Sequence, residues 1–310
     1  MKRPALLLAV FLCCAVAANS DAPNRPRIFG IEGVSIYVSD AHKARAFYDA
    51  LLDQDQRSKH PKRSFWREKP PAFSLNMSPN RFQFIGLEPA HSPAPSNLIA
   101  EVTFLTDNVA ALRSYLLANL TDTRSLTGPG MKYLSLTDPE GHKISFLETD
   151  GVLKDPKIIA ILSKGGYENE IIHAGFIVRD RAATEHFYKD ILGFRPYWHG
   201  GMKDDQTDWV SMQVPDGTDW LEFMVNVSPD ADHRVRGIMN HIAIGVTDIH
   251  ATQQKLIGNG AKLTEEPKIG RGGKWQLNVY DPDDTRIEFM EFTPVQKPCC
   301  SEYTGPHPKP

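Results

Sequence analysis

The stretch HAGFIVRDRAATEHFYKDILGF, residues 173–194, decides the fold because its pattern recurs along the chain. A short apolar run typical of a β-strand leads to an Asp, and an amphipathic helical pattern follows. Residues 33–52, GVSIYVSDAHKARAFYDALL, have the same strand, the same Asp and the same Phe-Tyr pair on the helix. Residues 100–120 and 241–263 share a strand that ends in Thr-Asp before a helix. The sequence therefore predicts four copies of one unit.

Strand-like stretches separated by turn residues follow each of these openings. They alternate apolar and polar residues, and three of the four contain an Asp-Pro or Asp-Gly turn, which is typical of β-hairpins. The stretches are residues 81–89, 132–148, 208–225 and 274–292. Each unit is therefore predicted to be a β-α-β-β-β module, and the chain an α+β protein.

Three landmarks indicate that the two halves of the chain are repeats of one another. Corresponding aspartates lie 140, 141 and 143 positions apart, in the pairs Asp40 and Asp180, Asp107 and Asp248, and Asp138 and Asp281. So small a drift favours duplication over chance. We predict one domain at residues 31–150 and a second at 170–293, with the boundary in the loosely patterned stretch from Asp150 to Glu170.

Composition allows a globular protein with a sizeable core and limits its partners. The chain has 310 residues, of which 41% are hydrophobic, and this length favours two domains. The 35 basic and 38 acidic residues give a formal charge of -3 without a long block of one sign. Nucleic acid is therefore not an expected partner, and a small-molecule substrate is. The oligomeric state stays open.

The N-terminus has the order of a secretory signal peptide. Lys2 and Arg3 precede an apolar run that ends near Ala18, which is short for a bilayer span. We predict that residues 1–18 are removed and that the protein is exported, to a periplasm or the outside of the cell. No stable membrane span is expected after cleavage.

The C-terminal tail, residues 294–310, is rich in Pro, Lys and Gly and is predicted to be disordered. It contains Cys299 and Cys300, which are the only cysteines after the signal peptide. Adjacent cysteines make poor disulfide frameworks, so no structural disulfide is expected in the core, and an intermolecular bridge stays open.

Four ionisable residues in the second half lie within apolar strand-like runs: His173, Glu222, His241 and Glu288. Facing a core together, they would bury several charges without compensation, at a cost of several kcal/mol each. A divalent cation would remove that penalty, and two imidazoles with two carboxylates suit Zn, Ni, Mn or Fe. The sequence therefore predicts a site for one divalent metal ion.

The doubled β-α-β-β-β unit with His and Glu on its first and last strands resembles the vicinal oxygen chelate superfamily. This superfamily includes glyoxalase I, methylmalonyl-CoA epimerase, the extradiol dioxygenases and the fosfomycin and bleomycin resistance proteins. The resemblance is most specific in FYKDILGF and DPDDTRIEF, residues 187–194 and 281–289. It implies two tandem domains of cupped mixed sheets, with the quartet as the ligands in the C-terminal one.

The same mapping gives the N-terminal half no strong ligand: Gly33, Gln83, Ala100 and Ser145 stand at the four positions. That half is predicted to be a degenerate copy of the fold. Glu148 and Glu291 lie three residues after Ser145 and Glu288, on the opposite strand face by the alternation of strand side chains, and are not counted as ligands.

Four further residues are candidates for contacts with substrate. The loop at residues 268–275 has glycines that free its backbone, and Arg271, Lys274 and Trp275 could bind an anionic or planar ligand. The alternative is an ordinary flexible hairpin. His199, in the segment PYWHGGMKDD, could also line the cavity.

The resemblance leaves three functions open. The full quartet implies a glyoxalase- or epimerase-type lyase or isomerase, in which a metal stabilises an enediolate and Glu288 or Glu222 moves the proton. An extradiol Fe(II) dioxygenase would use only His173, His241 and Glu288. The third reading is a protein that sequesters a small molecule. Export argues against methylglyoxal with glutathione as the substrate.

Overall fold

The computed structural model describes residues 24–52, 72–76, 82–90, 97–124, 126–130, 132–148 and 170–310. The predicted signal peptide at 1–18 and nearly all of the predicted boundary stretch lie outside these residues. No helix in the described ranges is long and apolar enough to cross a membrane.

The described residues of the first half form a seven-stranded mixed sheet from two modules, three strands from the first and four from the second, in the order β2-β3-β1-β4-β7-β6-β5. The first module consists of β1 (Ile28–Val38), α1 (Ala41–Leu51), β2 (Ala72–Asn76) and β3 (Phe82–Pro89). The second consists of β4 (Ile99–Thr106), α2 (Val109–Asn119), β5 (Thr127–Gly130), β6 (Tyr133–Thr137) and β7 (Lys143–Leu147).

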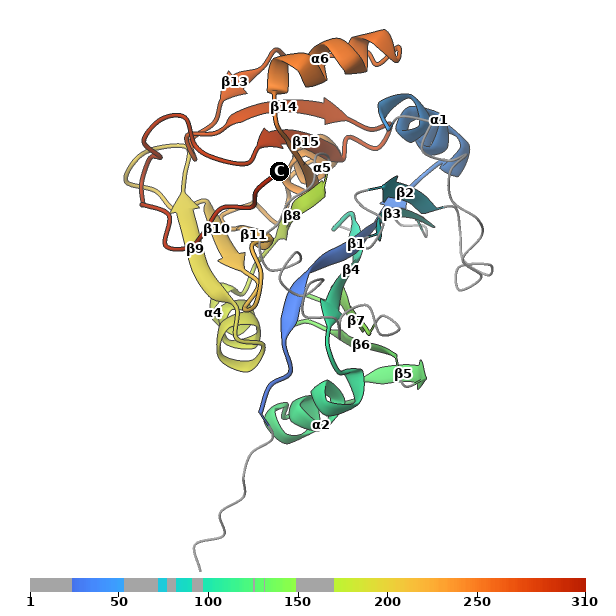
Figure 1. The fold of residues 1–310 in the computed structure, drawn as a ribbon, viewed down its shortest axis with the longest axis vertical. Helices are drawn as coiled ribbons and strands as arrows, with labels where there is room; N and C mark the ends of the chain where they lie inside the picture. The colour runs from blue at the N-terminus through green and yellow to red at the C-terminus, as the bar shows by residue number, and fades with distance from the viewer. Residues whose placement is uncertain are drawn as a thin grey trace, which may run out of the picture.

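The second half repeats this plan in an eight-stranded sheet, in the order β13-β14-β15-β12-β8-β11-β10-β9. Its first module consists of β8 (Glu170–Ile177), α4 (Arg181–Glu185), the π-helical turn η4 (His186–Ile191), β9 (Arg195–Gly200), β10 (Trp209–Gln213) and β11 (Trp220–Met224). After α5 (His233–Met239), the last module consists of β12 (His241–Val246), α6 (Ile249–Gly258), β13 (Lys268–Ile269), β14 (Trp275–Tyr280) and β15 (Arg286–Glu291). The predicted α+β fold with tandem cupped mixed sheets is confirmed (Figure 1).

Acidic side chains begin the helices after the strands. Asp180 accepts a hydrogen bond from the Ala183 amide, and Asp40 and Asp248 act in the same way at α1 and α6. Glu148 and Glu291 accept from the first amides of α2 and α6. These two glutamates thus serve helix N-termini on the face away from the cup.

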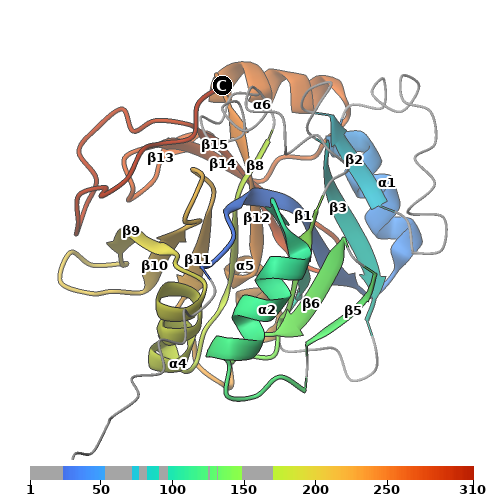
Figure 2. The same cartoon turned by 60° about the horizontal axis from the view of Figure 1, so that its bottom comes forward.

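Hydrogen bonds with the same symmetry cross between the two halves. The Tyr48 hydroxyl of α1 donates to Asp281 at 3.2 Å, and the Tyr188 hydroxyl of η4 donates to Asp138 at 2.9 Å. All four side chains are buried. Strands β1 and β8 lie centrally, between the outer strands of the two sheets (Figure 2). One apolar cluster, made of residues from both halves, fills the space on the helix side of both sheets.

The C-terminal tail contradicts the prediction of disorder. It packs across the other face of the second sheet: the Tyr303 hydroxyl donates to the Gly272 carbonyl at 2.9 Å, and the Thr304 amide donates to the Tyr197 carbonyl at 3.0 Å. Tyr303 adds to a second apolar cluster that includes Tyr197 and Trp220. Proline-rich composition suggested disorder, but aromatic side chains that find a partly apolar surface outweigh that tendency.

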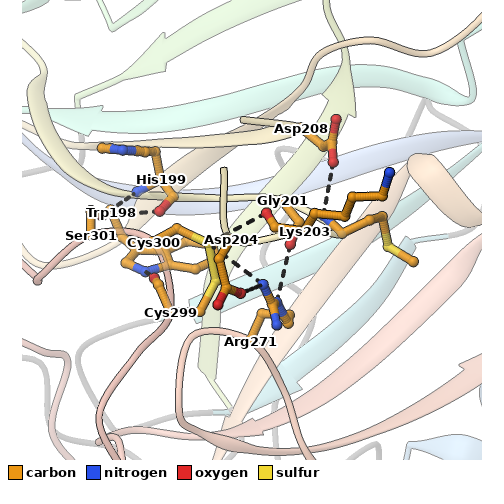
Figure 3. Close-up of a disulfide and its surroundings, with 11 residues drawn as sticks. Trp198, His199, Gly201, Lys203, Asp204, Asp208, Arg271, Cys299, Cys300 and Ser301 are labelled. Carbon is orange, nitrogen blue, oxygen red and sulfur yellow. Dashed lines mark hydrogen bonds and ion pairs between the residues drawn. A yellow bond between two sulfur atoms is a disulfide. The ribbon is translucent and has the colours of Figure 1, made fainter. Parts of the chain in front are cut away.

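Cys299 and Cys300 form a disulfide with one another in the tail, outside the core for which no structural disulfide was expected. The Cys299 carbonyl accepts from the Trp198 indole at 3.2 Å, and the Cys299 amide donates to the Arg271 carbonyl at 2.9 Å (Figure 3). The pair therefore lies where the tail meets β9 and the turn between β13 and β14.

Candidate metal centre

Neighbouring strands of the second sheet bring the four predicted ligands together. β11, β8, β12 and β15 are consecutive in this sheet and carry Glu222, His173, His241 and Glu288 in that order. His173 lies directly opposite Ala243 on β12, and Ala243 lies opposite Glu288 on β15. Residues far apart in sequence thus meet on one face of the sheet, as the repeat predicted.

The donor atoms of the quartet converge. The Nε2 atoms of His173 and His241 are 3.0 Å apart. Carboxylate oxygens lie 3.2 Å from His241 Nε2 for Glu222 and 3.5 Å from His173 Nε2 for Glu288. Neighbouring ligands of one ion with bonds of about 2.1 Å lie about 3 Å apart. The donor atoms of His173, Glu222 and His241 all lie within 4.8 Å of one another and suit a single divalent metal, and Glu288 lies beside this group, 3.9 Å from His241 Nε2.

The quartet lies almost entirely out of solvent. Both imidazoles and Glu288 are buried, and Glu222 is the most exposed, at 14% of its side chain. His173 Nδ1 has no hydrogen-bond partner in the described part of the chain. A buried set of two imidazoles and two carboxylates suits a cation of borderline softness.

The environment of the centre favours ionised carboxylates and a neutral His241. Burial acts to raise the pKa of Glu288, but the Arg286 guanidinium and the two imidazoles outweigh it and lower this pKa to about 2. Burial, with Arg286, lowers the pKa of His241 to about 4. Both groups are therefore ready to act as ligands at neutral pH.

Contacts around the imidazoles fix their positions. The Trp220 indole stacks on His173 with ring centroids 4.5 Å apart. His241 lies across Gly175, where a β-carbon would collide with its ring. His241 Nδ1 lies 2.9 Å from the Arg286 guanidinium and 3.4 Å from the Met239 carbonyl. Because a guanidinium can only donate, His241 Nδ1 accepts from Arg286 in this arrangement. A metal-binding Nε2 would instead require the proton on Nδ1, with the Met239 carbonyl as its acceptor in place of Arg286.

Strand pairing revises the comparison with the first half. Gly33 pairs with Phe84 and Thr103 as His173 pairs with Trp220 and Ala243, so Gly33 does correspond to His173. Ser145 lies opposite Thr103 as Glu288 lies opposite Ala243. These two predicted equivalences agree with the observed register.

The other two predicted equivalences are wrong. Gly86, and not Gln83, matches Glu222, because Gly86 pairs with Ser35 as Glu222 pairs with Gly175. Glu101, and not Ala100, matches His241, because it pairs with Ser35 and Lys143 as His241 pairs with Gly175 and Arg286. The second error has a simple cause: Asp107 follows Thr103 by four positions, whereas Asp248 follows Ala243 by five, so an offset taken from the two aspartates does not hold on the strands.

The first sheet holds a network of hydrogen bonds where the second sheet holds its four donors. Glu101 accepts from the Tyr133 hydroxyl at 2.8 Å, from the Lys143 ammonium at 3.0 Å and from the Ser145 hydroxyl. These bonds outweigh burial and hold the pKa of Glu101 below its usual value. Among the described residues, this sheet forms no group of three metal-binding side chains.

Three of the four predicted substrate residues lie away from the quartet. Arg271 donates to Asp204 and to the Gly201 carbonyl, beside the disulfide (Figure 3). Trp275 packs on the helix side of the sheet, against His250 of α6. His199 is exposed, and its backbone exchanges hydrogen bonds with Ser301 of the tail. Alternation along the strand would have placed Trp275 correctly.

The fourth, Lys274, does lie at the quartet. Its ammonium is buried over the rings of Trp220, Tyr197 and Tyr303. Tyr197 and Tyr303 also belong to this site and were not predicted. Tyr197 lies at a register shift in the β9–β10 pairing that simple alternation does not reveal, and nothing local in the tail indicates that Tyr303 folds back.

Asp204, Cys299 and Cys300 form a second group of potential ligands. The two sulfurs are bonded to each other and Asp204 is paired with Arg271, so this group holds the tail against the 201–204 loop.

Residues 170–289 match the family described as the Glyoxalase/Bleomycin resistance protein/Dioxygenase superfamily. The lactoylglutathione lyase of Haemophilus influenzae is 31% identical over 124 residues, which is 39% of this chain and 92% of that protein. A probable chloroplastic lactoylglutathione lyase of Arabidopsis thaliana is 24% identical over 43% of this chain and 39% of its own length. The chain belongs to this superfamily, as its sequence pattern predicted.

Solved structures of dioxygenases share the fold over nearly the whole chain. Homoprotocatechuate 2,3-dioxygenase from Brevibacterium fuscum matches 92% of this chain and 84% of its own, with a TM-score of 0.55 and 18% identity. A catechol 2,3-dioxygenase matches 91% and 95%, with a TM-score of 0.57 and 12% identity. Together with the sequence relatives and the convergent donors, these likenesses identify a metal-dependent enzyme that uses a single divalent ion. They leave its reaction class open.

Proposed function

We propose that His173, Glu222, His241 and Glu288 hold one divalent ion, and that the enzyme is a glyoxalase- or epimerase-type lyase or isomerase. The observation that carries this proposal is the fourth donor. The Glu222 carboxylate lies 3.2 Å from His241 Nε2, so two carboxylates converge with the two imidazoles. Such an ion would polarise two neighbouring oxygens of a small substrate and stabilise the negative charge that develops when an adjacent C–H loses its proton.

The two glutamates differ in a way that assigns their roles. Glu288 is buried, and the positive charge of Arg286 stabilises its ionised form. Glu222 is the most exposed of the four, and its contact with the Ser211 hydroxyl is long, at 3.4 Å. Burial acts to raise the pKa of Glu222, but interactions with the two imidazoles outweigh it and hold this pKa below its ordinary value, so the carboxylate is ionised and can accept a proton. Glu288 is therefore the fixed ligand, and Glu222 moves the proton.

The test of this proposal measures exchange of the substrate C–H proton with solvent. The metal-loaded protein is incubated with α-hydroxy and α-keto compounds in D₂O, and exchange of the adjacent C–H is measured by NMR. We expect exchange without oxygen consumption, reduced at least 100-fold in Glu222→Gln, while the variant still binds metal. Full exchange in that variant would remove Glu222 as the base, and less than about one metal equivalent in the wild type would refute the metal site itself.

The second candidate is an extradiol dioxygenase with His173, His241 and Glu288 as a facial triad for Fe(II). The observation in its favour is architectural, because the dioxygenase structures match more than nine-tenths of this chain. Glu222 is then an extra carboxylate. The measurement is oxygen uptake with catechols after anaerobic loading with Fe(II). Uptake that coincides with ring cleavage would favour this candidate over the first.

Export remains part of the proposal, on the order of residues in the N-terminal 18 positions. A thiol-dependent lyase that needs cytosolic glutathione would be misplaced outside the cytoplasm. We therefore place the substrate among small oxygenated compounds that need no thiol cofactor. Sequencing the N-terminus of the mature protein checks this directly, since a chain that retains residues 1–18 would contradict cleavage.

A further inference from the structure

Lys274 is a buried cation without an anion in contact. It precedes β14, its side chain is 1% exposed, and its Nζ atom has no hydrogen-bond partner among the described residues. The rings around it are those of Trp220 at 4.7 Å, Tyr303 at 5.3 Å and Tyr197 at 5.9 Å, measured to the ring centroids. Lys268, on the same hairpin, is exposed and paired with Glu265. Contact with aromatic faces compensates only in part for the lost hydration of an ammonium group.

This aromatic cage lies beside the metal centre. Trp220 forms one of its walls and also stacks on His173. The charge of Lys274 is felt by both Glu222 and Glu288, although neither lies within ion-pair distance of it. The ammonium thus lies at the edge of the centre, close enough to contact a molecule bound there.

The charges of the filled centre leave Lys274 uncompensated. Two ionised carboxylates and one divalent ion cancel, and metal-bound imidazoles are neutral. Arg286, in contact with His241, adds one positive charge, and Lys274 adds a second one among aromatic rings and close to the His307 imidazole. A ligand that brings one negative charge beyond its two chelating oxygens would neutralise it, and an uncharged diol or ketol would not.

We propose that Lys274 binds a negatively charged oxygen group of the substrate, so that this enzyme acts on small anions such as α-hydroxy or α-keto carboxylates. The inference rests on the proposed metal site and deepens it by naming the substrate class. Burial lowers the pKa of Lys274 to about 7, and an anion in contact would raise it again. Binding of such an anion near pH 8 is therefore coupled to proton uptake.

A matched pair of ligands tests this inference on the full mature chain loaded with Zn²⁺. Acetohydroxamate chelates a metal through two neighbouring oxygens, and hydroxyoxamate is the same molecule with a carboxylate in place of the methyl group. Their affinities are measured by calorimetry for the wild type, Lys274→Met, Lys274→Arg and Lys268→Met. The last variant removes a cation from the same hairpin without touching the cage.

We expect Lys274→Met to weaken hydroxyoxamate at least tenfold while acetohydroxamate and the metal content change less than twofold. Lys274→Arg should keep the preference for the carboxylate, and Lys268→Met should behave as the wild type. Equal effects of Lys274→Met on both ligands, or no effect on either, would overturn the inference while the metal site stands. A wild type that binds neither metal nor chelator would instead refute the proposed function.

The wild type offers an independent test in case Lys274→Met does not fold. Calorimetry at pH 8 in two buffers of different ionisation enthalpy reports the protons taken up on binding. Because the hydroxamate group is common to both ligands, the difference between them reports on Lys274. We expect hydroxyoxamate to take up more protons than acetohydroxamate, and equal uptake would contradict a contact between Lys274 and the carboxylate.

Discussion

The two sheets of this protein are built from the same kind of module, but buried charges on their concave faces are compensated in different ways. In the second sheet, four donors converge and their charges call for a cation. In the first sheet, Glu101 is the one strong ligand type at the four corresponding positions, and its neighbours Tyr133, Lys143 and Ser145 satisfy it by hydrogen bonds. The difference teaches that this fold does not need the metal to be stable, provided that each buried charge finds protein partners.

The largest expected difference between the two sheets is in metal binding when one carboxylate or imidazole is replaced in each. His241→Ala removes an imidazole ligand, and we expect its metal affinity to fall at least 100-fold. Glu101→Gln changes the corresponding position of the first sheet and should leave one metal equivalent bound. Metal content after dialysis, measured by mass spectrometry, checks both variants. Loss of metal from Glu101→Gln would show that the first sheet contributes to the site.

Removing the tail should make the second cup accessible. A chain that ends at Phe292 lacks Tyr303, which covers Lys274. We expect a chelator to remove the bound metal at least tenfold faster from this variant than from the full chain. Glu302→Ala, which changes only an exposed side chain of the tail, is the control. Unchanged release from the shortened chain would mean that the tail does not limit access.

The two Asp-Pro turns should respond differently to pH. Burial raises the pKa of Asp281 to about 7, while its counterpart Asp138 is paired with His142 at 2.9 Å. A folded-state pKa above the unfolded value means that stability is fully present below about pH 4 and falls as pH rises through 7. Relative to Asp281→Asn, the wild type should therefore lose about 2 kcal/mol of unfolding free energy between pH 5 and 8.

Urea unfolding at the two pH values measures this difference. Asp138→Asn is the matched control, because it breaks the contact with His142 and should be destabilised at both pH values. Parallel pH profiles for the wild type and Asp281→Asn would contradict the raised pKa.

The smallest expected effect is a difference in stability between variants of the two tyrosines that hydrogen-bond across the halves. Tyr48→Phe and Tyr188→Phe each remove one buried hydrogen bond between the halves, worth about 1 kcal/mol. Asp138 keeps His142 as a partner when Tyr188 is changed, whereas Asp281 has no histidine partner in the part of the chain that the structure describes. We expect Tyr48→Phe to be the more destabilised of the two at pH 8, by denaturant titration. The reverse order would show that His142 does not compensate.

The sequence predicted the modules and the quartet because both are local patterns repeated at a nearly constant offset. It failed where the spacing changes. One residue more between Ala243 and Asp248 than between Thr103 and Asp107 moved the true counterpart of His241 from Ala100 to Glu101. It also failed for the tail, because the residues that order Tyr303 lie on strands far away in the chain. Lys274 was predicted as a substrate contact, but only the fold shows its buried ammonium.

Gln83, which the sequence comparison aligned with the ligand Glu222, connects the two halves of the chain. The Gln83 side chain accepts a hydrogen bond from the Ile171 amide of the second half at 2.6 Å. In the reciprocal contact, Asp219 of the second half accepts from the Ile31 amide of the first half at 2.8 Å. If the two halves were separated, each would lose the hydrogen-bond partner of one buried amide. A second copy of the same half could supply such a partner. In this respect the two halves pack against each other as the two subunits of a dimer do. Deleting the first half would leave the Ile171 amide without its Gln83 partner and would expose the surface that the two halves share.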